Sequence, residues 1–394
     1  MIKDKNFLLL FPYPSEPDGQ SLQGNLLLKG MLDLGYKVFP CDRANNEQKW
    51  WAYEHYKPDI VIGTGYWGDT PDLITDTLEH GFQPVPWLNA DGWVANYHDI
   101  LNKLPLLLVT SKWVKETYER DGVKGEHIQV AHIGFDPLVF YPVPENDSSR
   151  LHLRKLLGVE EDEKMILIIG GDVTSKGAQE MLKALAKIDK EFPKWKLVFK
   201  VWDSFSAKNH GKEESQLIKE LELPEEKIKY LEGKFAPEFI AALLNACDIY
   251  AAPSRLEGFG MIQVEAQACG KPVISINAGG PADTIVHGKT GYLVDVGEEI
   301  QLVSEWALPR HGFAKKQMIY FDQPKTFAYR ANIDQLAECV LKLLKDDELR
   351  KEMGKAAAKH ALDNFHYIKT TQDLLNIIEK NIFSKEIKLE LSSS

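Results

Sequence analysis

The chain is predicted to form two α/β domains, each a doubly wound parallel sheet, and three observations support this prediction. Its 394 residues exceed what one hydrophobic core ordinarily serves and suit two domains of roughly 150–200 residues. Short apolar runs alternate with segments of helical period in both halves of the chain. A polar stretch at residues 142–150, PVPENDSSR, interrupts this alternation and is the best candidate for a linker.

The apolar runs define the predicted strands and the domain limits. In the first half, strands are predicted at residues 7–11, 37–40, 59–63, 85–89, 106–110 and 128–133. In the second half, they are predicted at residues 164–169, 196–202, 228–232, 248–251, 272–277 and 292–294. Helical patterns cover residues 21–34, 112–120, 334–345 and 367–382. We therefore expect an N-terminal domain (1–145), a linker (146–163), a C-terminal domain (164–365) and a final helix with a polar tail (366–394).

Composition disfavours several classes of protein. The four cysteines are scattered and form no CxxC pair, so neither a zinc site nor a disulfide framework is indicated. No stretch approaches 18 apolar residues, and the first apolar run stops at Pro12, so we expect a cytoplasmic protein without an integral membrane segment. The net charge is −11, and residues 1–145 carry 12 Lys and Arg against 20 Asp and Glu. This acidity disfavours nucleic acid as a partner. The sequence indicates no oligomeric state.

The segment PSRLEGFGMIQVEAQACGKPV, residues 253–273, is the most informative part of the chain. It follows a short predicted strand and begins a helix near Phe259. Gly258 and Gly260 let the backbone approach a ligand closely. The free N–H groups at the start of the helix, together with the positive end of its dipole, favour a phosphate.

Two glutamates in this segment are candidate ligand-binding groups. Glu257 precedes the helix and Glu265 lies inside it, so one carboxylate can meet a transferred sugar while the other meets the ribose of a nucleotide. A pair of glycosidase carboxylates is disfavoured, because eight helical residues rise about 12 Å whereas such pairs lie roughly 5–9.5 Å apart. From the spacing alone, two exposed helix charges are an equally good interpretation.

On these residues the sequence resembles the retaining GT-B glycosyltransferases of family 4, the glycosyl transferases group 1. The family's E-x7-E motif fits Glu257 to Glu265, with its flanks PS, EGFG, EA, ACG and PV in place. NAGGPADTIVHGKTGYLV at residues 277–294 is similar to the family's glycine-rich loop, helix and strand. VAHIGFDPLVFYP (130–142) and LLVTSKWVKE (107–116) resemble segments of its N-terminal domain. The resemblance implies a GT-B fold, with two Rossmann-like domains facing each other across a cleft and the final helix returning to the N-terminal domain.

The resemblance also implies roles for particular residues. Glu257 should hold hydroxyls of the donor sugar, and Glu265 should hold the ribose. The backbone that lines the sugar and the diphosphate should be that of Gly258, Phe259, Gly260 and Met261. Gly19, in the first predicted loop after a strand, lies where the family's N-terminal glycine loop approaches the diphosphate, although a plain turn is an equal interpretation.

The sequence departs from the family pattern at two places. The family usually carries an Arg and a Lys on the diphosphate, but GGDVTSKG (170–177) keeps only Lys176 and has Gly171 or Asp172 in place of the Arg. Either Asp172 turns away from the diphosphate or another cation substitutes, and the candidates are Lys200, Lys234 and Arg255. Many members also have a His near the donor sugar, whereas PWLNADGW offers Asp91, which can bind a sugar hydroxyl or cap a helix.

Six of the nine Trp residues lie in the N-terminal half, which holds the acceptor in this family: Trp50, Trp51, Trp67, Trp87, Trp93 and Trp113. Aromatic faces with a polar tip suit sugars, so the cluster hints at a carbohydrate acceptor, while core packing is the commoner role for any one of them.

The resemblance implies a retaining, metal-independent glycosyltransferase without a cofactor. The expected donor is a UDP- or GDP-linked sugar and the expected acceptor is a hydroxyl group, on a glycan. Glu257, Lys176 and Asp91 are the candidate catalytic residues. Two alternatives stay open: a GT-B sugar phosphorylase or epimerase, and a non-catalytic scaffold subunit, the latter motivated by the missing Arg.

Overall fold

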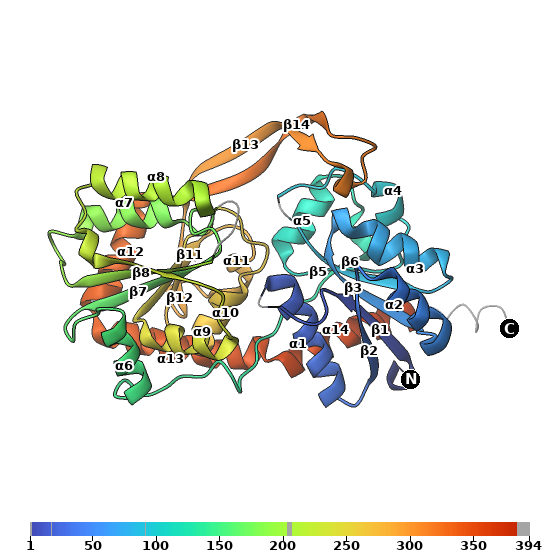
Figure 1. Cartoon of the computed structure of the whole chain (residues 1–394), viewed down its shortest axis with the longest axis horizontal. Helices are drawn as coiled ribbons and strands as arrows, with labels where there is room; N and C mark the ends of the chain where they lie inside the picture. Colours follow the sequence, from blue (N-terminus) through green and yellow to red (C-terminus); the bar gives the residue numbers. More distant parts are fainter. Residues whose placement is uncertain (1, 17, 91, 203–206, 384–394) are drawn as a thin grey trace. The chain divides into compact units, whose positions relative to one another are not determined.

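The computed structural model describes residues 2–16, 18–90, 92–202 and 207–383 (Figure 1). Its contacts divide the chain into two compact units. Unit 1 comprises residues 1–135, 301–327 and 365–394, and unit 2 comprises residues 136–300 and 328–364. Each unit has its own six-stranded parallel sheet with helices packed around it. The predicted fold class, two doubly wound α/β domains, is confirmed.

Unit 1 has a parallel sheet in the order β2-β1-β3-β4-β5-β6. Its strands are β1 (Asn6–Phe11), β2 (Lys37–Asp42), β3 (Ile60–Tyr66), β4 (Pro84–Asn89), β5 (Leu107–Val109) and β6 (Ile128–Val130). Its helices are α1 (Gly19–Asp33), α2 (Asn46–Trp51), α3 (Asp76–Glu79), α4 (His98–Leu101), α5 (Lys112–Arg120) and α14 (Tyr367–Ile378). Strand β1 is buried at every position after Asn6, because a parallel sheet covered on both faces has no solvent side.

Unit 2 also has a six-stranded parallel sheet, in the different order β12-β11-β10-β7-β8-β9. Its strands are β7 (Lys164–Ile169), β8 (Trp195–Val201), β9 (Ile228–Glu232), β10 (Ile249–Ala252), β11 (Val273–Ile276) and β12 (Gly291–Val294). Its helices are α6 (Ser148–Leu156), α7 (Ala178–Ile188), α8 (Ala207–Glu220), α9 (Pro237–Ala246), α10 (Met261–Ala268), α11 (Pro281–Thr284), α12 (Ile333–Lys345) and α13 (Asp347–Phe365). The order reverses between β7 and β10, and ligands of such sheets bind outside the carboxyl ends of the strands at that reversal.

A two-stranded sheet separates β12 from α12 and was not predicted. It consists of β13 (Val296–Ala307) and β14 (Gln317–Ala331), which run side by side as a long hairpin (Figure 1). Its outer part, residues 301–327, belongs to unit 1. There Lys325 Nζ lies 2.6 Å from Asp121 Oδ1, and the rings of Phe321 and Trp93 are in contact. The expected C-terminal domain, 164–365, included this outer part of the hairpin, which the structure instead assigns to unit 1.

The expected linker also differs from the structure. Residues 146–163 contain helix α6 and belong to unit 2. Asp147 caps α6 by accepting hydrogen bonds from the backbone N–H groups of Ser149 and Arg150. The polar composition of this stretch thus reflects a helix cap and an exposed helix face rather than a flexible connection.

The final helix α14 packs against α1 in unit 1. Gly30 of α1 permits the contact, because a Cβ atom there would lie 2.1 Å from Thr371 Oγ1. The Tyr367 hydroxyl donates a hydrogen bond to Asp33 at 2.6 Å. A helix at the end of the chain thereby completes the fold of the first sheet.

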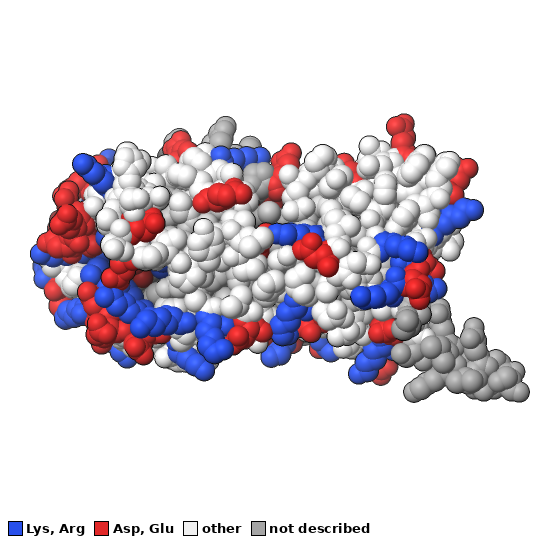
Figure 2. Space-filling model, turned by 90° about the horizontal axis from the view of Figure 1, so that it is seen from below, with Lys and Arg blue, Asp and Glu red and all other residues white. Residues whose placement is uncertain are grey.

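The surface face drawn in Figure 2 carries Lys and Arg side chains among Asp and Glu side chains, without one large basic patch. Among the helices that the structure describes, none is long and apolar enough to cross a membrane.

Candidate active site

The loop before α10 carries the first predicted glutamate. The helix begins at Met261, two residues after the predicted start, because Gly260 adopts a left-handed conformation with φ 95°. Only glycine adopts this conformation without strain. Gly258 and Phe259 are buried and directly precede the N-terminus of α10.

The glycine-rich loop after β11 fixes the position of Glu257. The Gly280 N–H group donates to the Glu257 carbonyl oxygen at 2.8 Å. A Cβ atom on Gly280 would lie 2.3 Å from the Phe259 Cα atom, and one on Gly279 would lie 2.5 Å from the Glu257 oxygen. The two predicted motifs, E-x7-E and GGP, are therefore one packed unit in space.

The loop between β7 and α7 brings Lys176 to the same place. Gly177 has φ 84°, and a Cβ atom there would lie 2.3 Å from the Pro253 carbonyl oxygen. The Arg255 N–H group donates to the Ser175 carbonyl oxygen at 2.8 Å. As a result Lys176 Nζ lies 2.6 Å from Glu257 Oε2, and both side chains are between a fifth and a third exposed. The structure thus pairs two of the predicted site residues, which are 81 positions apart in the chain.

Glu265 is almost fully buried in the second turn of α10, with 4% of its surface exposed. Burial raises the pKa of its carboxyl group to about 8. Among the described residues, no hydrogen bond or ion pair to this carboxyl group is found. Burial, and then the charges of Glu257 and Glu265, raise the pKa of the Tyr250 hydroxyl, so both carboxyl groups lie around one buried phenol. A buried carboxyl without an internal partner in such a loop cluster is typical of a ligand-binding group.

Both candidate positions for the missing arginine, Gly171 and Asp172, have close contacts within unit 2. Asp172 Oδ1 accepts a hydrogen bond from the Thr174 N–H group at 3.0 Å, so this carboxylate folds onto its own loop. At Gly171, a Cβ atom would lie 2.5 Å from the indole of Trp202. Any side chain at Gly171 would displace this indole.

The three candidate substitute cations have different surroundings. Arg255 is 3.1 Å from Glu180, a carboxylate with 2% of its side chain exposed, so it serves the packing of α7. Lys234 is exposed. Lys200 is 4% exposed, and its ammonium lies 4.3 Å from the centre of the Trp202 ring.

In unit 1, Gly19 is the first residue of α1 rather than a loop residue. Asp18 caps this helix by accepting hydrogen bonds from the N–H groups of Gln20 and Ser21. No atom lies within 4 Å of the position that a Gly19 Cβ atom would take, so the backbone here faces open space. Asp91, the third candidate catalytic residue, lies outside the described residues.

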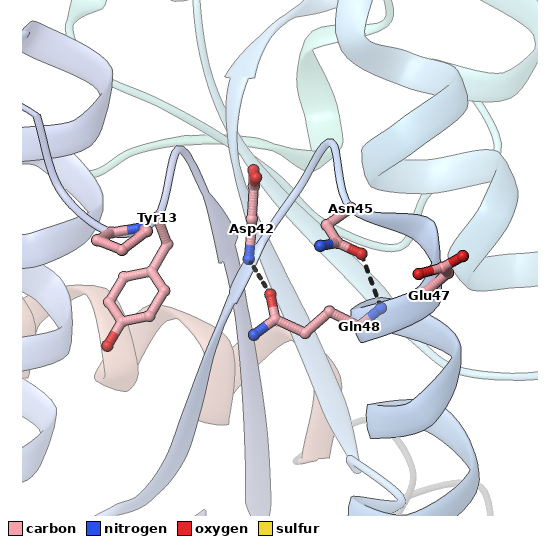
Figure 3. A pocket seen from close by; sticks show the side chains of 6 residues that line it. Tyr13, Asp42, Asn45, Glu47 and Gln48 are labelled. Carbon is pink, nitrogen blue, oxygen red and sulfur yellow. Dashed lines mark hydrogen bonds between the residues drawn. The ribbon is translucent and has the colours of Figure 1, made fainter.

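A pocket of about 500 Å³ in unit 1 was missed by the sequence analysis (Figure 3). It lies beyond the carboxyl ends of β1 and β2 and is lined by Tyr13, Pro14, Asp42, Asn45, Glu47 and Gln48. Gln48 Oε1 accepts from the Asp42 N–H group at 2.9 Å, and Asn45 Oδ1 accepts from the Gln48 N–H group at 3.0 Å. The available sequence signal was the polar run DRANNEQ directly after a strand, which is where such sheets bind ligands.

The tryptophans of the N-terminal half serve different purposes. Trp67, Trp87 and Trp93 are at most 8% exposed and belong to the core, and the Trp87 indole N–H donates to the Ala131 carbonyl oxygen. Trp50 and Trp51 are about half exposed. The commoner role, core packing, therefore applies to the three buried tryptophans.

Among the described residues, no group of three or more His, Cys, Asp or Glu side chains is arranged to hold a metal ion.

Two doubly wound units, with a lysine and two glutamates at the carboxyl edge of the second sheet, define the class as the two-domain GT-B fold. Solved structures agree on the fold. HepE of Anabaena, in complex with UDP and glucose, superimposes with a TM-score of 0.69 at 18% identity, covering 95% of this chain and 100% of that chain. A glycosyltransferase from Rickettsia africae superimposes with a TM-score of 0.71 at 18% identity, covering 96% and 98%.

The sequence comparisons match part of the chain to one family. Residues 149–307 match the family model of the glycosyl transferases group 1. A D-inositol 3-phosphate glycosyltransferase of Pseudarthrobacter chlorophenolicus is 32% identical over 219 residues, which are 55% of this chain and 49% of the relative. An N-acetyl-alpha-D-glucosaminyl L-malate synthase of Bacillus anthracis is 28% identical over 258 residues, 65% of this chain and 54% of the relative. The chain thus spans about half the length of these curated relatives.

Proposed function

We propose that this protein is a retaining glycosyltransferase that uses a nucleotide-diphosphate sugar, UDP- or GDP-linked, and a hydroxyl acceptor. The observation that carries the proposal is the contact between Lys176 and Glu257 beside the N-terminus of α10. It combines a cation for a diphosphate, a carboxylate for sugar hydroxyls and free backbone N–H groups in one loop cluster. Glu265, buried without a partner among the described residues, supplies an acceptor for the ribose hydroxyls.

The proposed reaction exchanges one bond at the anomeric carbon for another. The bond from this carbon to the donor phosphate oxygen breaks, and a bond to the acceptor oxygen forms on the same face. The acceptor proton moves to the departing phosphate oxygen, so no protein base is required. Lys176 and the N–H groups at the start of α10 stabilise the negative charge that grows on the diphosphate. Glu257 accepts hydrogen bonds from the sugar hydroxyls and orients the anomeric carbon.

The names of similar proteins support a choice of donor, whereas the choice of acceptor depends on the charges of the unit 1 pocket. HepE was solved with UDP and glucose, which favours a UDP-sugar here. Two of the similar enzymes are named for inositol phosphate and malate, which are anions. The unit 1 pocket instead presents the carboxylates of Asp42 and Glu47, which repel an anion. We therefore propose a neutral acceptor with several hydroxyls, such as a glycan.

A non-catalytic subunit is the second candidate, because Gly171 or Asp172 stands where the family usually carries an arginine. The two candidates differ in one measurable property. An enzyme releases nucleoside diphosphate when donor and acceptor are both present, whereas a scaffold does not.

The test combines donor binding with product analysis. The full chain is screened against UDP- and GDP-sugars by thermal shift, since a bound donor stabilises the folded state by mass action. The stabilising donor is then incubated with glycan acceptors in EDTA, and NMR follows the anomeric configuration of the product. We expect one donor class to bind and the product to retain its configuration. Absence of binding by every donor, an inverted product, or activity that is lost in EDTA and restored by Mg²⁺ or Mn²⁺ would contradict the proposal. The cytoplasmic location stays a prediction.

A further inference from the structure

The loop at the carboxyl end of β7 has a glycine pair with side chains packed on both members. The Lys176 side chain runs over Gly170, where a Cβ atom would lie 2.6 Å from Lys176 Cγ. The Trp202 indole covers Gly171, where a Cβ atom would lie 2.5 Å from Cε2 and 2.6 Å from Nε1. An arginine at position 171 and the indole of Trp202 therefore exclude each other.

The neighbouring strand places a second cation beside this indole. Lys200 of β8 pairs with Ile169 of β7 in the sheet, and its carbonyl oxygen accepts a hydrogen bond from the Gly170 N–H group at 3.1 Å. Its ammonium lies 4.3 Å from the centre of the Trp202 ring and 5.6 Å from the centre of the Phe235 ring. Lys200 thus lies at the carboxyl edge of the sheet, one aromatic ring away from the glycine pair.

The burial of Lys200 is costly without a compensating anion. Only 4% of its surface is exposed, and burial lowers the pKa of its ammonium to about 8. In the part of the chain that the structure describes, no carboxylate forms an ion pair with it. The two aromatic faces compensate only partly, because a cation–π contact stabilises less than the burial of an unpaired charge destabilises.

Another lysine of the same strand behaves differently. Lys196, four residues earlier on β8, reaches the surface and donates to the Glu226 carbonyl oxygen at 2.6 Å. A lysine on this strand can therefore reach solvent-exposed partners, and Lys200 is held inside by the aromatic residues around it. An anionic ligand at the carboxyl edge of the sheet accounts for a cation kept there.

We propose that Lys200, held against Trp202, takes the place of the missing arginine and binds the diphosphate of the donor together with Lys176. The inference rests on the proposed function, because it needs a nucleoside diphosphate in unit 2. The cation is moved from the loop after β7 to the end of β8, and Trp202 fills the space that the arginine side chain would need. The two lysines then flank the Gly170–Gly171 backbone.

The experiment measures binding of UDP and of uridine to the full chain by calorimetry. Lys200→Met keeps an unbranched, flexible stem that is one atom shorter and removes the charge, and Lys196→Met is the matched control on the same strand. We expect Lys200→Met to weaken UDP binding roughly 10- to 100-fold, the loss of one charged hydrogen bond, and to leave uridine binding within about twofold. The control should change neither affinity.

Three results separate the possible failures. UDP affinity within about twofold of the wild type in folded Lys200→Met protein would overturn the role of Lys200 alone. An equal loss for UDP and uridine would assign Lys200 to the nucleoside and likewise overturn it. If the wild-type chain binds neither UDP nor GDP, the proposed function itself fails.

A second variant tests the exchange directly and does not depend on the single substitution. Adding Gly171→Arg and Trp202→Gly to Lys200→Met restores the family's arrangement. We expect this triple variant to recover most of the UDP affinity that Lys200→Met loses. A folded triple variant that binds uridine and still does not recover UDP affinity would contradict the exchange.

Discussion

Glu265→Gln should make unit 2 more stable and at the same time weaken donor binding. The substitution keeps the shape of the side chain and removes its ability to ionise. The structure buries the Glu265 carboxyl group in α10 and raises its pKa from 4.5 to about 8. Glutamine carries no charge, so it avoids the cost of a buried carboxylate.

The magnitude and its pH dependence follow from this shift. Because the folded state holds its proton up to a higher pH than the unfolded state, stability decreases as pH rises from about 4.5 to about 8. Each pKa unit corresponds to about 1.4 kcal/mol, so the loss at pH 8 is on the order of 3–5 kcal/mol. Glu265→Gln should therefore match the wild type near pH 4.5 and exceed it by this amount near pH 8.

The assay must report on unit 2 alone, because a two-domain chain does not unfold in one step. Hydrogen exchange of backbone amides in α10 and β11, measured at pH 5 and pH 8, gives the free energy of opening for this unit. Glu238→Gln, an exposed glutamate of α9, is the control and should show no such pH dependence. Calorimetry with UDP above pH 8, where the carboxyl group of the folded wild type is ionised, measures the second effect, a loss of roughly 10- to 100-fold in affinity when the carboxylate acceptor for the ribose is removed.

Two results would refute the reasoning. A stability difference between Glu265→Gln and the wild type that stays constant from pH 5 to pH 8 would show that the carboxyl group is not held in a strongly desolvated site. Unchanged UDP affinity in a folded variant would show that Glu265 does not bind the ribose.

Three further substitutions test the rest of the site. Lys176→Ala should lower kcat by about 100- to 1000-fold with a smaller effect on KM, because it removes charge stabilisation on the leaving group. Lys176→Arg should restore part of the lost kcat. A loss of kcat below tenfold in steady-state assays would show that another cation holds the diphosphate. Gly177→Ala should cost more stability than Gly288→Ala, since both have positive φ but only at Gly177 would the Cβ atom meet a backbone oxygen, at 2.3 Å; equal shifts in melting temperature would contradict this packing. Asp42→Asn should raise the KM of a glycan acceptor and leave donor affinity unchanged. An unchanged acceptor KM would show that the unit 1 pocket does not bind the acceptor.

The β13–β14 hairpin shows where pattern reasoning failed. Most of its residues are at least partly exposed, so its strands show neither an apolar run nor a clean alternation. Its position depends on contacts with distant residues, such as that between Phe321 and Trp93. Strands are predicted from the periodic apolar residues that burial requires. Too few residues of this hairpin are buried to produce such a pattern.

Features that are local in the chain could be predicted from the sequence. Both sheets were predicted because strands covered on two faces are continuous apolar runs. The turn and the helix that carry Glu257 and Glu265 were also predicted, because the two glycines and the helical pattern that follows them are local features of the sequence. The start of this helix was wrong by two residues, because the left-handed conformation of Gly260 delays it.

Other features arise only when distant segments meet. The contact of Lys176 with Glu257 needs Gly177 packed against Pro253, and no local pattern encodes that approach. The raised pKa of Glu265 depends on desolvation by the surrounding fold. The sequence showed Gly171 or Asp172 where the family usually has an arginine, but only the packing of β8 beside β7 showed that the indole of Trp202 covers Gly171. The space that a side chain occupies is decided by its neighbours in three dimensions.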